Sequence, residues 1–231
     1  MKRSKIQQEI ANAKALIEKN NIKLPMFGYW NLDEWKSNIE KLGTIRQTLL
    51  GWDVTDFGHG DFDKIGAVLF TIRNGVLNKP EVGCPYAEKL IIMKDSQVLP
   101  LHFHFNKTED IINRAGGVLQ IQVYNSLENE EVDYESDVNV YLDGILHTVP
   151  AGTIMDIYPG NSMTITPRLY HLFMAKPGEG DVVVGEVSAV NDDSTDNRFA
   201  AAASNYYAGI EEDEAVTVPL NSEYEAMIFN A

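Results

Sequence analysis

The sequence has almost no cysteine, and Cys84 is the only one among 231 residues. A chain with one cysteine has no internal disulfide, and it suits a reducing compartment. Long apolar runs are missing as well. The N-terminus reads Lys2-Arg3-Ser4-Lys5 and continues as an amphipathic pattern, without the apolar region of a signal peptide. We therefore expect a cytoplasmic protein that does not associate with membranes.

Basic residues are also scarce, because 19 lysines and arginines stand against 34 aspartates and glutamates and leave a net charge of -15. Such a surface repels the phosphates of nucleic acids, so we expect no nucleic-acid partner. No linker rich in proline, serine or glycine divides the chain. Its length is sufficient for one large domain with its own core.

Helical patterns occupy the beginning of the chain. One stripe of apolar residues predicts a helix over residues 4–20. A second helix is expected from Asn31, with Glu34 completing a capping box and Gly43 at the position of a C-terminal cap. Residues 49–64 are rich in glycine, aspartate and aromatic residues, and we interpret them as an ordered loop.

The pattern changes from helix to strand at residue 65. Many short strands separated by turn residues predict an antiparallel sandwich or barrel. We therefore divide the chain into a helical and loop extension (1–64), a β-barrel (65–190) and an irregular tail that closes the site (191–231). The expected strands are residues 66–73, 88–93, 98–105, 118–124, 138–142, 145–149, 154–158, 163–166, 169–175 and 182–190.

His102 and His104 are two residues apart, and in an extended strand this spacing places both imidazoles on one face. Glu109 follows after four residues, enough for a turn to return a carboxylate toward that face. His171 lies well downstream. Three imidazoles and one carboxylate suit a divalent first-row metal such as Mn, Fe, Co, Ni or Zn. The sequence thus predicts a metal site, with histidines satisfied inside a core as the alternative.

Hairpin geometry suggests that a lysine side chain lies on the same sheet face as the two histidines. If residues 95–96 form a two-residue turn, Lys89 lies opposite His102 on the paired strand. A slip of one residue would turn Lys89 to the other face. Lys94, beside the turn, is then the alternative cation. A solvated strand lysine is the simpler interpretation of Lys89.

The same argument suggests a carboxylate. If the loop over residues 177–180 closes a hairpin symmetrically, Glu186 lies opposite His171. A carboxylate beside a metal site is a candidate general base. The simpler interpretation is a carboxylate at the rim of the sheet.

These motifs resemble the cupin superfamily. The glycine that usually precedes the first cupin motif is Ser96 here, and residues 167–171 lack the glycine that usually precedes the last histidine of the second motif. His147 competes with His171 for that place but lies in a hairpin near a turn. The residues that match the spacing of the first motif are His102, His104, Glu109 and Gly116.

Within the cupins the chain is similar to the D-lyxose ketol-isomerases over nearly its whole length. That resemblance implies a jelly-roll-like cupin barrel, a homodimer and a Mn(II)-dependent isomerase, with Fe(II), Co(II) or Zn(II) as other possible metals. The implied reaction interconverts D-lyxose and D-xylulose, often with D-mannose and D-fructose as well. The shared stretches are residues 87–93, 109–114, 167–171, 185–188, 191–193 and 196–197.

Aldose–ketose isomerisation moves one hydrogen between C1 and C2, so the enediolate needs stabilisation and a base must move the proton. Glu186, or Glu212 in the tail, is the candidate base, and Lys89 the candidate donor to a developing oxyanion. A hydride shift is the alternative route. The candidate substrate-binding residues are Lys94, Asp196, Asn197 and Arg198.

Two other functions use the same ligands. An Fe(II) cupin dioxygenase would consume oxygen during turnover, and a non-catalytic sugar-binding cupin would bind its ligand without turnover. The tail is rich in carboxylates and amides, which suits a polyhydroxylated substrate and favours the isomerase.

Overall fold

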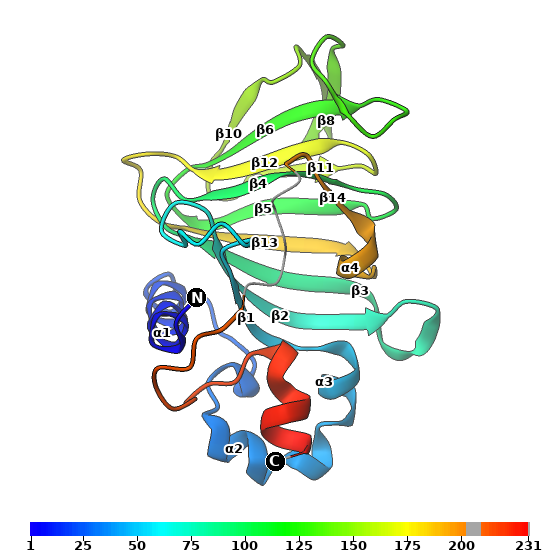
Figure 1. The fold of residues 1–231 in the computed structure, drawn as a ribbon. Helices are drawn as coiled ribbons and strands as arrows, with labels where there is room; N and C mark the ends of the chain where they lie inside the picture. The colour runs from blue at the N-terminus through cyan, green and yellow to red at the C-terminus, as the bar shows by residue number, and fades with distance from the viewer. Residues whose placement is uncertain (202–208, 231) are drawn as a thin grey trace.

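Two antiparallel sheets face each other and form a curled half-barrel (Figure 1). The computed structural model describes residues 1–201 and 209–230, and residues 202–208 and 231 of the predicted tail lie outside the described residues. The first sheet is ordered β1 (Gly51–Thr55), β2 (Ala67–Val76), β3 (Lys79–Met93), β13 (Val182–Ala189), β5 (Glu109–Gly116), β11 (Ser162–Ile165), β8 (Val138–Leu142) and β9 (Ile145–Val149). The second sheet is ordered β10 (Ile154–Ile157), β6 (Leu119–Ser126), β12 (Tyr170–Ala175), β4 (Val98–His104) and β14 (Asn197–Phe199), and β7 (Val132–Asp133) pairs with β6.

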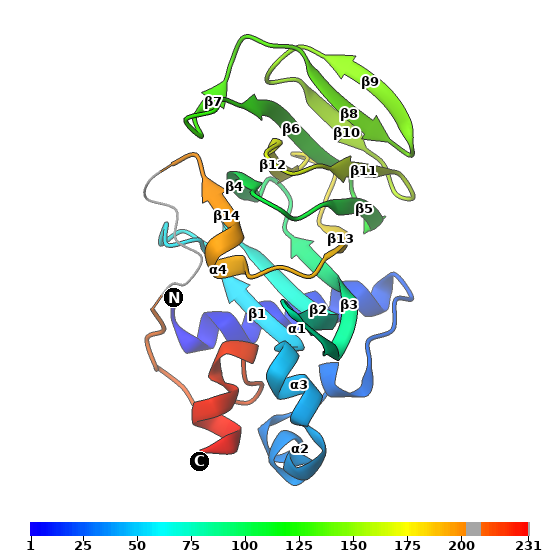
Figure 2. The same cartoon turned by 90° about the vertical axis from the view of Figure 1, so that its right-hand side faces the viewer.

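Helices cover one side of the first sheet and the end of the molecule where the C-terminus lies (Figure 2). Among the described residues, no helix is long and apolar enough to cross a membrane. The α-helices are α1 (Arg3–Lys19), α2 (Leu32–Ser37), α3 (Gly43–Thr48) and α4 (Asp193–Asp196). Shorter helical turns lie at Met26–Gly28, Ile39–Lys41, Asn221–Glu223 and Glu225–Phe229.

The first sheet is buried on both faces over residues 67–71 of β2 and 89–93 of β3, where successive residues point to opposite faces and are all buried. Leu69 and Ile91 belong to the core between the two sheets. Phe70 and Ile92 belong to a second core, where the apolar stripe of α1 covers the outer face. This double burial explains why the run before Met93 is apolar without alternation.

The predicted all-β fold with N-terminal helices is confirmed. The capping box of Asn31 and Glu34 is present, but α2 ends at Ser37 and Gly43 begins α3 instead of capping the preceding helix. The expected loop at 49–64 contains β1, which pairs with β2. Strand β5 was not expected either.

The two predicted hairpin registers are wrong. The turn after Met93 connects β3 of the first sheet to β4 of the second, so these strands do not pair. Lys89 pairs with Glu186 across β3 and β13, whereas His171 pairs with His102 across β12 and β4. Both sheets turn their inner faces toward one interior, and Lys89 and Glu186 are therefore buried near the histidines although neither is their strand partner.

Gly116 ends β5 in a backbone conformation that only glycine adopts without strain. Its φ is +92°, and a β-carbon there would lie 2.1 Å from the carbonyl oxygen of Asp181. Gly144, in the β8–β9 turn, has a φ of +80° but nothing within 4 Å of its would-be β-carbon. Substituting Gly116 would therefore cause both a clash with the backbone and conformational strain, whereas substituting Gly144 would cause the strain alone.

We predict that Gly116→Ala lowers the free energy of unfolding by about 3 kcal/mol, since the clash adds to the strain of a left-handed residue. Gly144→Ala is the matched control and should lose about 1 kcal/mol through strain alone. Urea denaturation measures both variants. Equal losses would show that the close approach at Gly116 does not constrain the fold.

Candidate metal centre

Three buried histidines converge on the inner face of the second sheet. His102 and His104 leave the same face of β4, and His171 lies opposite His102 on β12. One nitrogen from each of the three rings lies within 4.8 Å of the others. Neighbouring strands and a spacing of two residues therefore bring together the three histidines that the sequence predicts.

The other ring nitrogen of each histidine donates a hydrogen bond that orients the ring. Nδ1 of His102 donates to the carbonyl of Pro100 at 2.8 Å, and Nδ1 of His171 donates to the carbonyl of Leu169 at 2.9 Å. His104 donates at 2.7 Å to the side-chain oxygen of Asn197, which lies on β14. With Nδ1 donating in each ring, Nε2 is the nitrogen that faces the interior of the site.

No described residue supplies a hydrogen bond to Nε2 of His104 or His171, although both atoms are buried. Buried polar atoms in proteins are nearly always satisfied, so two that point at one place indicate a missing ligand. A divalent metal ion fits, because neutral imidazole nitrogens are its usual protein ligands.

Glu109 supplies the carboxylate at the start of β5. Its Oε1 lies 3.3 Å from Nε2 of His104 and also 3.3 Å from Nε2 of His171. Its Oε2 lies 2.7 Å from Nζ of Lys107. Burial raises the pKa of the Glu109 carboxyl, but Lys107 and the neighbouring histidines outweigh burial and hold this pKa well below its usual range. The carboxylate is thus ionised, as a metal ligand must be.

Burial acts on the histidines in the opposite sense. It lowers the pKa of His102 well below the ordinary value, and the nearby His171 and His104 lower it further. Burial also lowers the pKa of His171 and outweighs the opposing effect of Glu109. Both rings are therefore neutral at pH 7 and keep a lone pair for a metal.

Lys107 is a site residue that the sequence reasoning missed. Its side chain is only 3% exposed, and its Nζ lies 2.7 Å from Glu109 and 3.1 Å from Oε1 of Glu186. The same Oε1 lies 3.5 Å from Nζ of Lys89. Glu186 therefore lies between two lysines, at hydrogen-bonding distance from one of them. A lysine inside the His104 to Glu109 segment was the available signal.

The predicted tail residues have three different positions. Asp196 is buried, and its carboxylate accepts hydrogen bonds from the backbone of Asn106 and Lys107. Asn197 binds His104. The side chain of Arg198 is half exposed and lies 3.3 Å from Glu130, on the other face of β14. Thus only Asn197 among these three lines the cavity at the histidines.

Phe199, which the sequence reasoning also missed, shares the inward face of β14 with Asn197. Its ring stacks on His102 at a centroid distance of 5.3 Å. It also lines the cavity at the histidines, which measures about 40 Å³. An apolar ring on a metal-binding imidazole excludes water and holds the imidazole in place.

Other predicted residues lie elsewhere. Glu212 binds the buried Arg3 at 2.7 Å, near the N-terminus. Lys94 binds Glu9 of α1 at 2.7 Å, on the outer side of the first sheet. His147 is exposed on β9. The structure does not bring these three side chains to the histidines.

Ser96 and Arg168 occupy the two positions at which the cupin motifs usually have glycine. Ser96 has a φ of +66° and Arg168 has a φ of +64°, so both residues adopt the left-handed conformation that glycine adopts without strain. The backbone therefore keeps the turn before each histidine strand without the glycine. Each non-glycine residue costs roughly 1–2 kcal/mol there.

Known proteins resemble this chain over nearly its whole length. Residues 1–224 match the family described as D-lyxose isomerase. A D-lyxose/D-mannose isomerase of Escherichia coli O157:H7 is 41% identical over 226 residues, which cover 97% of this chain and 98% of that protein. A D-lyxose/D-mannose isomerase of Serratia proteamaculans is 39% identical over 225 residues, with 97% and 98% covered.

Solved structures show the same fold at low identity. The L-ribose isomerase of Acinetobacter sp. DL28, in complex with L-ribose, superposes with a TM-score of 0.60 at 15% identity, covering 91% of this chain and 98% of that chain. The L-ribose isomerase of Geodermatophilus obscurus gives a TM-score of 0.57 at 17% identity, with 91% and 98% covered. This likeness confirms the expected cupin-like fold.

We predict that Asn197→Ala weakens Mn²⁺ binding about 10- to 100-fold, because His104 loses the acceptor that orients its ring. His104→Ala should abolish binding. Arg198→Ala is the neighbouring control and should bind as the unmodified protein does, since its side chain points away from the site. Calorimetric titration with Mn²⁺ measures all three. Unchanged affinity in Asn197→Ala would contradict the orienting role.

Proposed function

The chain belongs to the D-lyxose isomerase family, an aldose–ketose isomerase family, and we propose that it interconverts D-lyxose with D-xylulose and D-mannose with D-fructose in a metal-dependent reaction. One observation supports the metal dependence. Buried imidazole nitrogens that lack a hydrogen-bond partner converge on one place, next to the carboxylate of Glu109. The two relatives with D-mannose in their names support the second pair of sugars.

We propose that the metal ligands are His102, His104, Glu109 and His171. Three imidazoles and a single carboxylate suit Mn(II), and they also accept Fe(II), Co(II) or Zn(II). Such an ion would act as a Lewis acid on the sugar carbonyl. Phe199 shields the imidazole of His102 from water on one side. Asn197 holds the ring of His104.

We propose Glu186 as the base that takes the proton from C2 and returns it to C1. Its carboxylate faces the same cavity as the histidines, and its Oε1 lies 3.1 Å from Nζ of Lys107. Lys107 and Lys89 are the cations beside it, so either ammonium group can donate to an oxygen that becomes negative at C1 or C2. Asp196 holds the backbone of Lys107 and so positions its side chain.

We also propose that the protein forms a homodimer through β9. This strand is an edge of the first sheet, and its apolar side chains are exposed, with Ile145 at 64% and Leu146 at 53%. An exposed apolar edge strand readily pairs with another chain. A second copy would cover it by the two-fold symmetry that is commonest among homo-oligomers. Exposed Tyr141 and Ile154 on nearby strands extend the patch.

The proposed function is tested by incubating the metal-free protein with D-lyxose, D-mannose and other aldoses, with and without Mn²⁺. We expect ketose from D-lyxose and D-mannose in the presence of the metal, and loss of activity on chelation, because the ligand set requires an ion. Oxygen consumption would indicate the dioxygenase. Binding of sugar without ketose formation would indicate a non-catalytic protein.

In the same assay, Glu186→Gln should retain Mn²⁺ and lose about 10²- to 10⁴-fold in turnover, since the amide cannot accept the proton. Isomerisation in D₂O should introduce deuterium into the product. A variant that loses its metal would show that Glu186 is instead a ligand or a structural group. Absence of deuterium would favour the hydride shift.

We predict that Leu146→Lys converts the dimer to a monomer, because a buried lysine without a partner destabilises the interface. Met26→Lys is the control, since Met26 is also an exposed apolar residue but lies in the helical region away from β9. Sedimentation equilibrium measures the mass of each. A monomeric unmodified protein at micromolar concentration would refute the proposed interface.

A further inference from the structure

A large cavity, here called the chamber, adjoins the small cavity at the histidines. It measures about 520 Å³, against about 40 Å³ for the small one. The chamber lies between the end of α3, the inner face of β1 to β3, the β2–β3 hairpin and the segment before α4. Leu69 and Lys89 line both cavities, so the two cavities border each other at these side chains.

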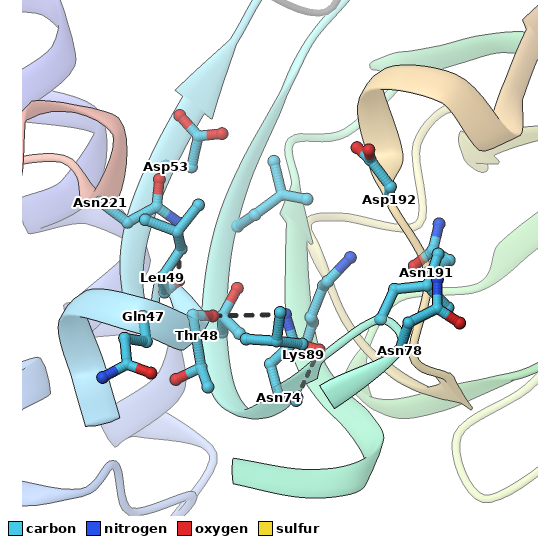
Figure 3. Close-up of a pocket in the computed structure, with 15 residues that line it drawn as sticks. Gln47, Thr48, Leu49, Asp53, Asn74, Asn78, Lys89, Asn191, Asp192 and Asn221 are labelled. Atoms are coloured by element: carbon cyan, nitrogen blue, oxygen red, sulfur yellow. Dashed lines mark hydrogen bonds between the residues drawn. The ribbon is translucent and has the colours of Figure 1, made fainter. Parts of the chain in front are cut away.

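The side chains of the chamber are those that bind sugar hydroxyls. Amides, carboxylates and hydroxyls both donate and accept hydrogen bonds, or accept them in pairs, as vicinal hydroxyls require. Figure 3 shows them on two walls with Lys89 between, one wall carrying Gln47 and Asn221 and the other Asn78 and Asn191. Two further polar lining residues, Asp53 on β1 and Thr71 on β2, are buried.

The charges of the chamber select against an anionic ligand. Asp53 lies on one wall and Asp192 on the other (Figure 3). Among the described lining residues Lys89 is the only cation, and it lies at the junction with the histidine cavity, 3.5 Å from Glu186. A phosphate in the chamber would therefore face carboxylates. The chamber suits a neutral polyhydroxylated group.

The size of the chamber exceeds what the reacting sugar needs. C1 and C2 of the substrate must lie between the histidines and Glu186, in the small cavity. The remaining carbons then extend past Lys89 into the chamber. A volume of about 520 Å³ lies within the roughly 300–1,000 Å³ typical of pockets for drug-sized ligands, a class that a disaccharide matches better than a single aldose does.

We propose that the chamber binds a second, neutral glycosyl residue joined to O4 of the reacting aldose, so that the enzyme isomerises the reducing end of a disaccharide. This proposal rests on the proposed aldose–ketose isomerase function. In the reaction, one hydrogen moves from C2 to C1 and one proton passes from O2 to O1, so the C1 carbonyl becomes a hydroxyl and the C2 hydroxyl becomes a carbonyl. The glycosidic bond stays intact, and no further reactant is needed.

β-1,4-Mannobiose is the probe, and the Mn²⁺-loaded protein is assayed for 4-O-mannosylfructose. We expect a kcat/KM within about tenfold of that for D-mannose, because contacts with the remote ring contribute binding energy. The control is α-1,2-mannobiose, whose blocked O2 prevents isomerisation. D-Mannose 6-phosphate should react more slowly than D-mannose, since its phosphate faces Asp53 and Asp192.

Gln47→Trp narrows the chamber, because this exposed helix residue lines it. We expect the ratio of kcat/KM for the disaccharide to that for D-mannose to fall about tenfold or more. Gln8→Trp is the matched control, an exposed glutamine on α1 that does not line the chamber, and its ratio should equal that of the unmodified protein.

The outcomes separate this proposal from the function on which it rests. Turnover of D-mannose with no turnover of β-1,4-mannobiose would refute the binding of a second glycosyl residue in the chamber, but it would not contradict the isomerase function. A ratio unchanged by Gln47→Trp would place the second ring outside the chamber and refute it as well. Absence of turnover with D-lyxose and D-mannose alike would overturn the isomerase function and with it the proposal.

Discussion

The ion pair of Lys107 and Glu109 is the interaction on which the site depends. Both side chains are almost fully buried at a contact of 2.7 Å. An unpaired carboxylate in this interior would be neutralised by a proton, and a protonated carboxyl could not serve as a metal ligand. Lys107 also reaches Glu186, which Lys89 approaches from the other side. Two lysines and two glutamates thus alternate, and this balance of charge makes a polar centre tolerable inside an apolar half-barrel.

The strand pattern was predictable from sequence, but the pairing of strands was not. Alternation identifies β4 and β12 because it is local. The turn at Asp95 has the sequence of a hairpin, yet it crosses from one sheet to the other, and only the long-range packing of the two sheets decides this. Strand β5 was missed because its residues, Glu-Asp-Ile-Ile-Asn-Arg, do not alternate between polar and apolar. Its place in the sheet comes from pairing with β13 and β11 on either side, and only one of its faces is buried.

The same limit applies to the site. The spacing of His102 and His104 implies a shared face, whereas the meeting with His171 was inferred through the resemblance to cupins and not through local geometry. Lys107 lies in a turn without periodicity, and its place depends on Asp196, which is 89 residues away. Ser96 and Arg168 show why motif matching misleads in detail. The family motif has glycine at these positions, but the fold requires only a residue with a positive φ. The rest of the structure must then offset the strain of a non-glycine residue there.

The side chains of the site come from both sheets. The histidines belong to the second sheet, on β4 and β12, while Glu109, Glu186 and Lys89 belong to the first. The distance between the three histidines and Glu186, the group that would move a proton, is therefore set by how the sheets pack, through core residues such as Ile111 and Phe173. Close-packed interiors resist small displacements, so such a core fixes this distance more firmly than a loop would. The proposed catalytic geometry is thus a consequence of core packing, and changes in the core between the sheets act on the chemistry without touching a polar residue.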